Sequence, residues 1–253
     1  MKIEGTVALV TGGANDIGRA ISAKLGEKGA ATVVIHYLSS KGEATATAAM
    51  IEKTGAKAAI VRADISKEAE VKAMVHDIVR DHGRLDILVN NAAIRAVADY
   101  NDLDALDDAA WDDLYRVNVL GPFYCARAAA PALRRARGAI INIASIAGYR
   151  SVGSSLHYGV SKAALLQLTR GLARALAPEV RVNAISPGTV DTRWHRGQQG
   201  AKFDAWATSE IARMPLGRLV KPEDIAQMVV GFVESDIVTG EDIIVDAGRH
   251  LLY

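Results

Sequence analysis

Short apolar runs alternate with stretches of helical spacing along the whole chain. The runs at 7–10, 32–37, 58–62, 87–90, 139–144, 181–185 and 243–245 have the length and continuous apolar character of buried strands. Helical patterns fill the intervals, beginning near Ile17, Lys41, Lys67, Leu106, Ser155 and Pro222. Continuous apolar strands that alternate with helices predict a parallel sheet covered on both faces. We therefore expect an α/β fold with one doubly wound domain over 1–253 and a seven-stranded parallel sheet.

The segment 191–217 interrupts this alternation. It contains Trp194, Phe203 and Trp206, with Gly197 and Gly200 between them. A long excursion after a strand end is typical of a lid over a binding site. The alternative is a partly ordered surface loop, but three aromatic side chains argue against disorder. We predict a substrate lid.

Composition narrows the class of protein. Half of the 253 residues are hydrophobic, so a large core is possible, and the net charge of +1 gives no basis for a broad nucleic-acid surface. The single cysteine, Cys125, excludes an intrachain disulfide and suits a small core position. We see no leader segment and no run of about 18 apolar residues. We expect a soluble cytoplasmic protein with no membrane or nucleic-acid partner, and no metal site.

A tyrosine and a lysine four residues apart carry the first chemical signal. Tyr158 and Lys162 would share one helix face, and Ser145 would end the strand before them. A phenol has a reference pKa of about 10, and a neighbouring ammonium favours its ionised form. Such a group suits proton exchange with a carbonyl or alcohol. Tyr37 and Lys41 repeat the spacing, so the pair alone is weak evidence, and an ordinary solvated helix face is the alternative.

The first strand runs into a glycine-rich turn, TGGANDIGR at 11–19. Glycines at a strand-to-helix turn let the backbone approach a pyrophosphate, whose charge the helix N-terminus favours. The spacing is not the common G-x-G-x-x-G, and a turn that only permits tight packing is the alternative.

Later strand ends carry further candidates for a nucleotide site. Asp64 could accept from an adenine amino group, the segment 90–93 leaves room for a flat ligand, and 186–192 could meet a nicotinamide amide. Each alone could be a helix cap or a turn. Their order at successive strand ends favours one site.

Together these residues resemble the short-chain dehydrogenase/reductase family, and 3-oxoacyl-carrier-protein reductase-like members in particular. The resemblance extends from Thr6 to about Gly248. The matching positions are Thr11, Gly12 and Gly18 of the turn, Asn90, Asn91 and Ala92, Asn118, Ser145, Tyr158 and Lys162, Pro187 and Gly188, and the tail 239–248. The resemblance implies a Rossmann-type NAD(P)-binding domain and a homotetramer, with a dimer as the next choice.

The resemblance also implies a role for each site residue. Tyr158 exchanges the proton, Ser145 polarises the carbonyl, Lys162 lowers the Tyr pKa and holds the nicotinamide ribose, and Asn118 anchors a water. The implied cofactor-binding residues are Gly12, Asn15, Asp16, Ile17, Tyr37, Ser39, Asp64, Ile65, Asn91, Ala93, Lys162, Pro187, Gly188, Val190 and Thr192. For Asn118, a helix residue that satisfies a kink beside Gly121 and Pro122 is the alternative.

Three positions depart from the family pattern. Asp16, Ala93 and Ala247 each stand where the family usually has glycine. Aspartate tolerates left-handed backbone and can cap a helix. Its carboxylate is unhelpful beside a pyrophosphate, so we expect the Asp16 side chain to point away or to cost affinity.

The residues after the second strand favour NADP(H) over NAD(H). An acid there would repel a 2′-phosphate, but the nearest acid is Glu43. Ser39, Ser40 and Lys41 could donate to a phosphate, and His36 is compatible with one. Against this, Asn15 stands where many NADP-preferring members carry Arg or Lys, and Lys41 could simply be a solvated helix start.

We predict reversible hydride transfer between the nicotinamide and a ketone or secondary alcohol. The expected substrate contacts are Ser145, Tyr158, Arg95, Arg150 and Trp194, with further mouth positions at Ile94, Ile146, Tyr149, His157 and His195. Arg95 and Arg150, with Arg193 and Arg196, would form a basic rim suited to a carboxylate or phosphate. A non-catalytic NAD(P)-binding regulator on the same fold is the main alternative, and the complete Ser-Tyr-Lys-Asn set argues against it.

Overall fold

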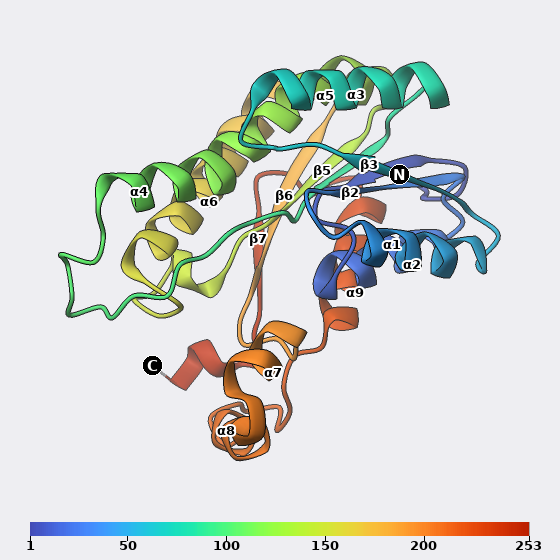
Figure 1. Cartoon of the computed structure of the whole chain (residues 1–253). Coiled ribbons are helices and arrows are strands. Elements are labelled where there is room, and N and C mark those ends of the chain that lie inside the picture. Colours follow the sequence, from blue (N-terminus) through green and yellow to red (C-terminus); the bar gives the residue numbers. More distant parts are fainter. Residues whose placement is uncertain (253) are drawn as a thin grey trace.

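The predicted apolar runs form one seven-stranded sheet in the computed structural model, which describes residues 1–252 (Figure 1). The strands are β1 (Val7–Val10), β2 (Thr32–Tyr37), β3 (Lys57–Arg62), β4 (Ile87–Asn90), β5 (Ala139–Ile143), β6 (Arg181–Pro187) and β7 (Asp242–Val245). All pairings are parallel, in the order β3-β2-β1-β4-β5-β6-β7. The order reverses between β1 and β4, which opens a crevice at their carboxyl ends. The doubly wound, Rossmann-type fold is confirmed.

Helices cover both faces of the sheet. They are α1 (Asp16–Glu27), α2 (Lys41–Glu52), α3 (Glu68–His82), α4 (Asp108–Tyr115), α5 (Gly121–Ala136), α6 (Leu156–Leu176), α7 (Arg193–Gln199), α8 (Phe203–Ile211) and α9 (Pro222–Glu234). Side chains of β1 alternate between two cores: Val7 and Leu9 pack with α3, α5 and α6, whereas Ala8 and Val10 pack with α1, α2 and α9. Cys125 is buried in the first core as a free thiol. Within residues 1–252 no helix combines the length and apolar character needed to cross a bilayer.

The helical pattern predicted to begin near Leu106 is divided into two helices. A π-helical turn at Arg116–Leu120 separates α4 from α5. Pro122 lies in the first turn of α5 and lacks the N–H that would bond the carbonyl of Asn118 in an α-helix. The ladder therefore widens at this point, and Asn118 lies at the centre of the turn.

The segment 191–217 is mostly helical. It contains α7, a 3₁₀ turn at Gly200–Lys202 and α8. Figure 1 shows these two helices in orange, projecting below the carboxyl edge of the sheet. Phe203, Ala207, Met214 and Leu219 form a small core of their own there, which explains how the excursion holds its shape.

Candidate active site

The glycine-rich turn is fastened to the end of β4. Gly12 has a left-handed φ of +62°, and a Cβ on Gly18 would lie 2.1 Å from the Gly12 carbonyl oxygen. The Asn91 side-chain amide donates to the carbonyls of Thr11 and Gly12, both at 3.1 Å. The turn therefore leads directly into the N-terminus of α1, an arrangement that fits the phosphates of a dinucleotide.

A cavity of about 310 Å³ extends from this turn along the crevice. Of the predicted cofactor residues, it is lined by Gly12, Asn15, Asp16, Ile17, Asn91, Ala93, Lys162, Pro187, Gly188, Val190 and Thr192. These residues come from the ends of β1, β4 and β6 and from α6. The prediction of one continuous site across the carboxyl edge agrees with this geometry.

The other four predicted cofactor residues lie at the same edge but outside the walls of the cavity. Tyr37 is half-buried and Ser39 is exposed at the end of β2. Asp64 follows β3, where its carboxylate accepts from the Ser66 amide at 3.0 Å and from the Ser66 hydroxyl at 2.7 Å. Ile65 lies against Gly121. The Asp64 carboxylate is therefore already engaged in a local turn.

His36 has a structural role and does not face a phosphate. Its ring is 2% exposed, its Nδ1 accepts from the Gly12 amide at 3.0 Å, and its Nε2 lies 2.9 Å from the Ala63 carbonyl. These partners require Nδ1 to be bare and Nε2 to carry the proton. Burial lowers the pKa of His36 from its ordinary value. The prediction that His36 could serve a phosphate is wrong because the ring is enclosed between strands.

Three predicted catalytic residues meet at the end of β5. Ser145 and Tyr158 form a side-chain hydrogen bond, and Ser145 Oγ accepts from the Ala147 amide at 3.1 Å. Lys162 is 3% exposed and donates to the Ile143 carbonyl at 2.8 Å. Burial, together with the smaller effect of the Arg95 charge, lowers the pKa of Lys162 to about 8.

The predicted lowering of the Tyr158 pKa by Lys162 is not seen in this structure. Burial raises the pKa of Tyr158, while the Ser145 hydrogen bond and the Arg95 charge oppose that shift. The Lys162 ammonium lies 5.8 Å from the Tyr158 ring centroid, and it is bonded to the Ile143 carbonyl. The Tyr158 hydroxyl is therefore protonated near neutral pH in this state.

Asn118 holds the chain that follows β4. Its Oδ1 accepts from the Ile94 amide and its Nδ2 donates to the Ile94 carbonyl, each at 2.9 Å. Nδ2 also lies 3.1 Å from Ser161 Oγ, one residue before Lys162. The side chain thus links the π-helical turn, the Ile94 backbone and α6, and its predicted water relay stays a prediction.

A second cavity of about 700 Å³ opens beneath the helices of 191–217. Both cavities are lined by Arg95, Ser145, Gly188, His195 and the phenol-bearing Tyr158. The Ser-Tyr pair therefore stands where the two cavities meet. This junction is the position required of a group that serves a cofactor on one side and a substrate on the other.

Aromatic side chains form one wall of the second cavity. The Arg95 guanidinium lies 3.1 Å from the Trp194 ring centroid, and among residues 1–252 it makes no ion pair. His195 stacks on Trp206 with centroids 4.9 Å apart. Burial lowers the pKa of His195 to about 4, so the ring is neutral near pH 7.

The predicted basic rim does not form. Arg150 donates to the His250 carbonyl at 2.6 Å and borders a separate hollow with Tyr149, so both substrate assignments are wrong. Arg196 is paired with Asp191. Arg193 contacts Asp16 of the glycine-rich turn and does not line the second cavity.

His157 is also misplaced by the sequence prediction. It is 1% exposed and packs on Trp111 of α4, and neither ring nitrogen has a hydrogen-bond partner within the described residues. It turns away from the cavity because it precedes Tyr158 on α6 and so points to another side of that helix.

Sequence reasoning missed the far wall of the second cavity. Glu210 of α8 and Arg249 near the C-terminus form an ion pair there, with Thr189 bonded to both. Neither member stands in a recognisable motif, and 39 residues separate them. Trp206 also lines this cavity, and its aromatic character was the available signal.

Comparison with known proteins agrees with the geometry. A family model described as enoyl-(acyl carrier protein) reductase matches residues 12–250. Ketoacyl reductase 2 of the granaticin polyketide synthase from Streptomyces violaceoruber is 39% identical over 251 residues, covering 98% of each chain. The 3-oxoacyl-[acyl-carrier-protein] reductase of Staphylococcus aureus is 35% identical over 249 residues, covering 96% of this chain and 98% of that protein.

Solved structures show the same similarity. A short-chain dehydrogenase/reductase from Burkholderia xenovorans superposes with a TM-score of 0.90 at 31% identity, covering 97% of this chain and 98% of that one. A short-chain dehydrogenase/reductase from Serratia marcescens gives a TM-score of 0.87 at 33% identity, covering 98% and 99%. The chain resembles 3-oxoacyl-[acyl-carrier-protein] reductases, and it belongs to the short-chain dehydrogenase/reductase family of oxidoreductases that act on CH–OH and C=O groups.

Proposed function

We propose that the protein is an NAD(P)-dependent oxidoreductase that interconverts a ketone and a secondary alcohol. The observation that carries this proposal is the position of Ser145 and Tyr158 at the junction of the two cavities. The first, smaller cavity has the glycine-rich turn at one end, so we assign it to the dinucleotide. The larger, aromatic-walled cavity is then the substrate site.

A nicotinamide dinucleotide bound in the first cavity would supply the hydride. The protein's residues supply the proton and the geometry. In the reductive direction the Tyr158 hydroxyl gives its proton to the carbonyl oxygen as the C–O double bond becomes single. The Ser145 hydroxyl donates a hydrogen bond to the same oxygen and holds it beside Tyr158.

Lys162 and Asn118 would assist Ser145 and Tyr158 indirectly. The ammonium is buried at the wall of the first cavity, where a ribose hydroxyl could replace the Ile143 carbonyl as its partner. Once the ammonium turns toward the tyrosine, its charge would lower the Tyr158 pKa. Asn118 fixes the Ile94 backbone and so the position of Arg95 beside the phenol.

NADP(H) is the proposed preference over NAD(H). The exposed Ser39 and Lys41 follow β2 at the carboxyl edge, and the first acid after that strand is Glu43. An exposed lysine and hydroxyl groups can donate hydrogen bonds to a 2′-phosphate, whereas a carboxylate would repel it.

Replacing Tyr158 with phenylalanine tests the mechanism because the ring and its packing remain. We expect turnover of a 3-oxoacyl thioester to fall by about 10²- to 10⁴-fold, the usual contribution of a proton donor. Binding of NADPH, followed by nicotinamide fluorescence, should stay within a few-fold of wild type. Turnover within a few-fold of wild type would show that Tyr158 is not the proton donor.

A panel of ketones separates the enzyme from the regulatory alternative. The panel should include 3-oxoacyl thioesters, cyclic ketones, steroids and sugars. Wild-type protein that binds NADPH but reduces none of these compounds would favour a cofactor-binding regulator. Ser145→Ala provides a second check, since it should lower turnover while leaving the dinucleotide cavity intact.

A further inference from the structure

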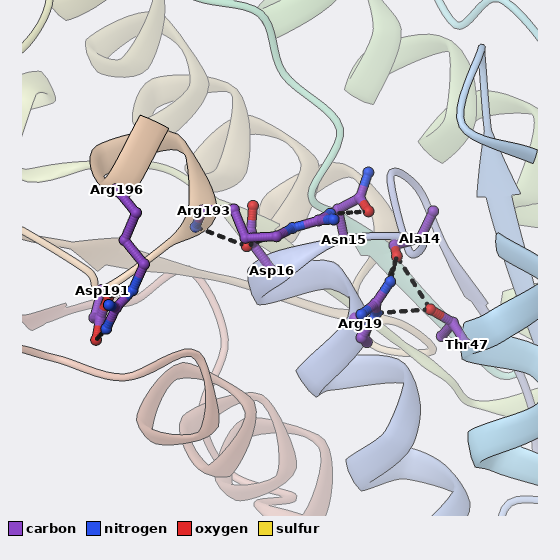
Figure 2. Close-up of polar contacts among 8 residues, drawn as sticks. All are labelled: Ala14, Asn15, Asp16, Arg19, Thr47, Asp191, Arg193 and Arg196. Atoms are coloured by element: carbon purple, nitrogen blue, oxygen red, sulfur yellow. Dashed lines mark hydrogen bonds and ion pairs between the residues drawn. The ribbon is translucent and has the colours of Figure 1, made fainter. Parts of the chain in front are cut away.

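The lid and the nucleotide turn are joined by one arginine (Figure 2). Arg193, the first residue of α7, donates from its guanidinium to the side-chain oxygen of Asn15. Its backbone N–H donates to Asp16 Oδ1 at 3.1 Å, and its Nε lies 3.5 Å from the same oxygen. Thr192, the preceding residue, lines the dinucleotide cavity together with Asn15 and Asp16. Arg193 itself lines an adjoining hollow along α1, which shares Asp16 with the dinucleotide cavity, so its guanidinium lies beside two residues of that cavity.

The contact between Arg193 and Asp16 changes the net charge that a phosphate would meet at the N-terminus of α1. Asp16 brings a carboxylate to the N-terminus of α1, where it would repel a phosphate. The Arg193 cation is placed against the same carboxylate oxygen and offsets that repulsion. At Asn15, Arg193 also brings a guanidinium from the segment 191–217 to the glycine-rich turn.

The other nearby arginines have fuller sets of partners, as Figure 2 shows for two of them. Arg196 makes two hydrogen bonds to the Asp191 carboxylate, at 2.9 and 2.6 Å. Arg19 donates to the Ala14 carbonyl and to the Thr47 hydroxyl. Arg193 and Arg196 are similarly exposed, at 54% and 56%, but the Arg193 side chain makes one hydrogen bond, to Asn15, and one longer contact, to Asp16, so it keeps donors for a further acceptor.

We propose that Arg193 is a phosphate-binding arm of the lid. With a dinucleotide in the cavity, the guanidinium contacts one of its phosphates and so ties α7 to the bound cofactor. Asn15 and Asp16 act as positioning residues that hold the arm at the cavity edge. This inference rests on the proposed function, and the phosphate could be the 2′-phosphate or the pyrophosphate.

Parallel titrations of NADPH and NADH test the proposal in wild type, Arg193→Gln and Arg196→Gln. We expect Arg193→Gln to weaken NADPH binding at least tenfold, about 1.4 kcal/mol, and Arg196→Gln to stay within about twofold. A loss confined to NADPH places the arm on the 2′-phosphate, and an equal loss for NADH places it on the pyrophosphate. Wild-type affinity of Arg193→Gln for both would overturn the proposal.

The outcomes separate this inference from the proposed function. If wild-type protein binds neither dinucleotide, the proposed function fails, and this inference falls with it. If wild type binds and Arg193→Gln binds equally well, only the inference fails. A melting curve for each variant checks that the half-exposed substitution leaves the fold intact.

The Asp16→Asn change provides a stricter test in the Arg193→Gln background. Without the arginine, the Asp16 carboxylate repels the phosphate, so its neutralisation should restore part of the lost NADPH affinity. An arginine that served only to hold the lid in place would give no such recovery. Binding by the double variant that is no tighter than that of Arg193→Gln alone would contradict the charge argument. The Arg193→Gln loss should also shrink as salt rises, because the contact is partly exposed.

Discussion

At the scale of single residues, His36 shows how a buried ring can fix a binding turn. It connects the Gly12 amide to the Ala63 carbonyl, and so joins the turn after β1 to the end of β3. Protonation of Nδ1 would place two donors against each other at Gly12. The acid form is therefore excluded from the folded protein, in agreement with the lowered pKa.

The sign of the pH effect follows from that exclusion. The unfolded chain takes up a proton near the ordinary histidine pKa of about 6.5, whereas the folded state does not. The contribution of His36 to stability is complete above that pKa and is lost as the pH falls below it. The slope is at most about 1.4 kcal/mol per pH unit for one proton.

His36→Asn is the matched variant, since an amide can accept from Gly12 and donate toward Ala63 without titrating. We expect the free energy of unfolding of wild type to fall more steeply than that of His36→Asn between pH 7 and 5. Urea melts at several pH values measure this difference. Equal slopes would show that His36 takes up its proton as readily in the folded state. His157 and His195 are retained in both proteins, so their own titrations cancel in the comparison.

At the scale of elements, the turn before α1 depends on the absence of a side chain. An added Cβ at Gly18 would meet the Gly12 carbonyl at 2.1 Å, and that carbonyl also accepts from Asn91. We expect Gly18→Ala to lower the melting temperature and to abolish measurable dinucleotide binding. Gly231→Ala in α9 is the control, because open space surrounds that position. It should stabilise the protein by about 0.5–1 kcal/mol. Dinucleotide binding retained by Gly18→Ala would show that the turn can relax.

The pattern of apolar residues was sufficient to predict the strands of the sheet and the helices that pack on it. The strand ends lie within two residues of their predicted positions, because buried apolar runs leave few alternatives. The same patterns failed at 106–135, where one proline converts a helical repeat into a π turn. They also missed α7 and α8, whose small satellite core involves too few residues to produce a recognisable repeat.

At the scale of the whole molecule, the site could be predicted as far as the sheet determines it. Residues at strand ends and on α6 lie together because parallel strands bring their carboxyl ends to one edge. The far wall of the second cavity comes from 191–217 and from Arg249, and its placement depends on long-range contacts such as that between Glu210 and Arg249. Arg95 and Trp194 line the second cavity, where their predicted contact with a substrate stays a prediction, whereas Arg150 borders another hollow.

Arg95 connects the segment after β4 to α7 at the wall of the second cavity. It follows β4, its guanidinium stacks on Trp194 of α7, and it lines both cavities beside Tyr158. Among residues 1–252 the Arg95 guanidinium makes no ion pair, so it can bind a polar or anionic group of a substrate. A substrate in the second cavity would contact Arg95 in the ground state as well as in the transition state, so the loss of Arg95 should mainly affect binding.

We therefore expect Arg95→Ala to raise KM by about tenfold or more, with a smaller change in kcat. Arg150→Ala is the matched control, because that arginine borders a different hollow, and its KM should stay near wild type. Steady-state kinetics at saturating cofactor measure both constants. Equal KM values for wild type and Arg95→Ala would remove Arg95 from the substrate site. A rise in KM for Arg150→Ala alone would place the substrate at the hollow beside Tyr149 and would remove the second cavity as the substrate site.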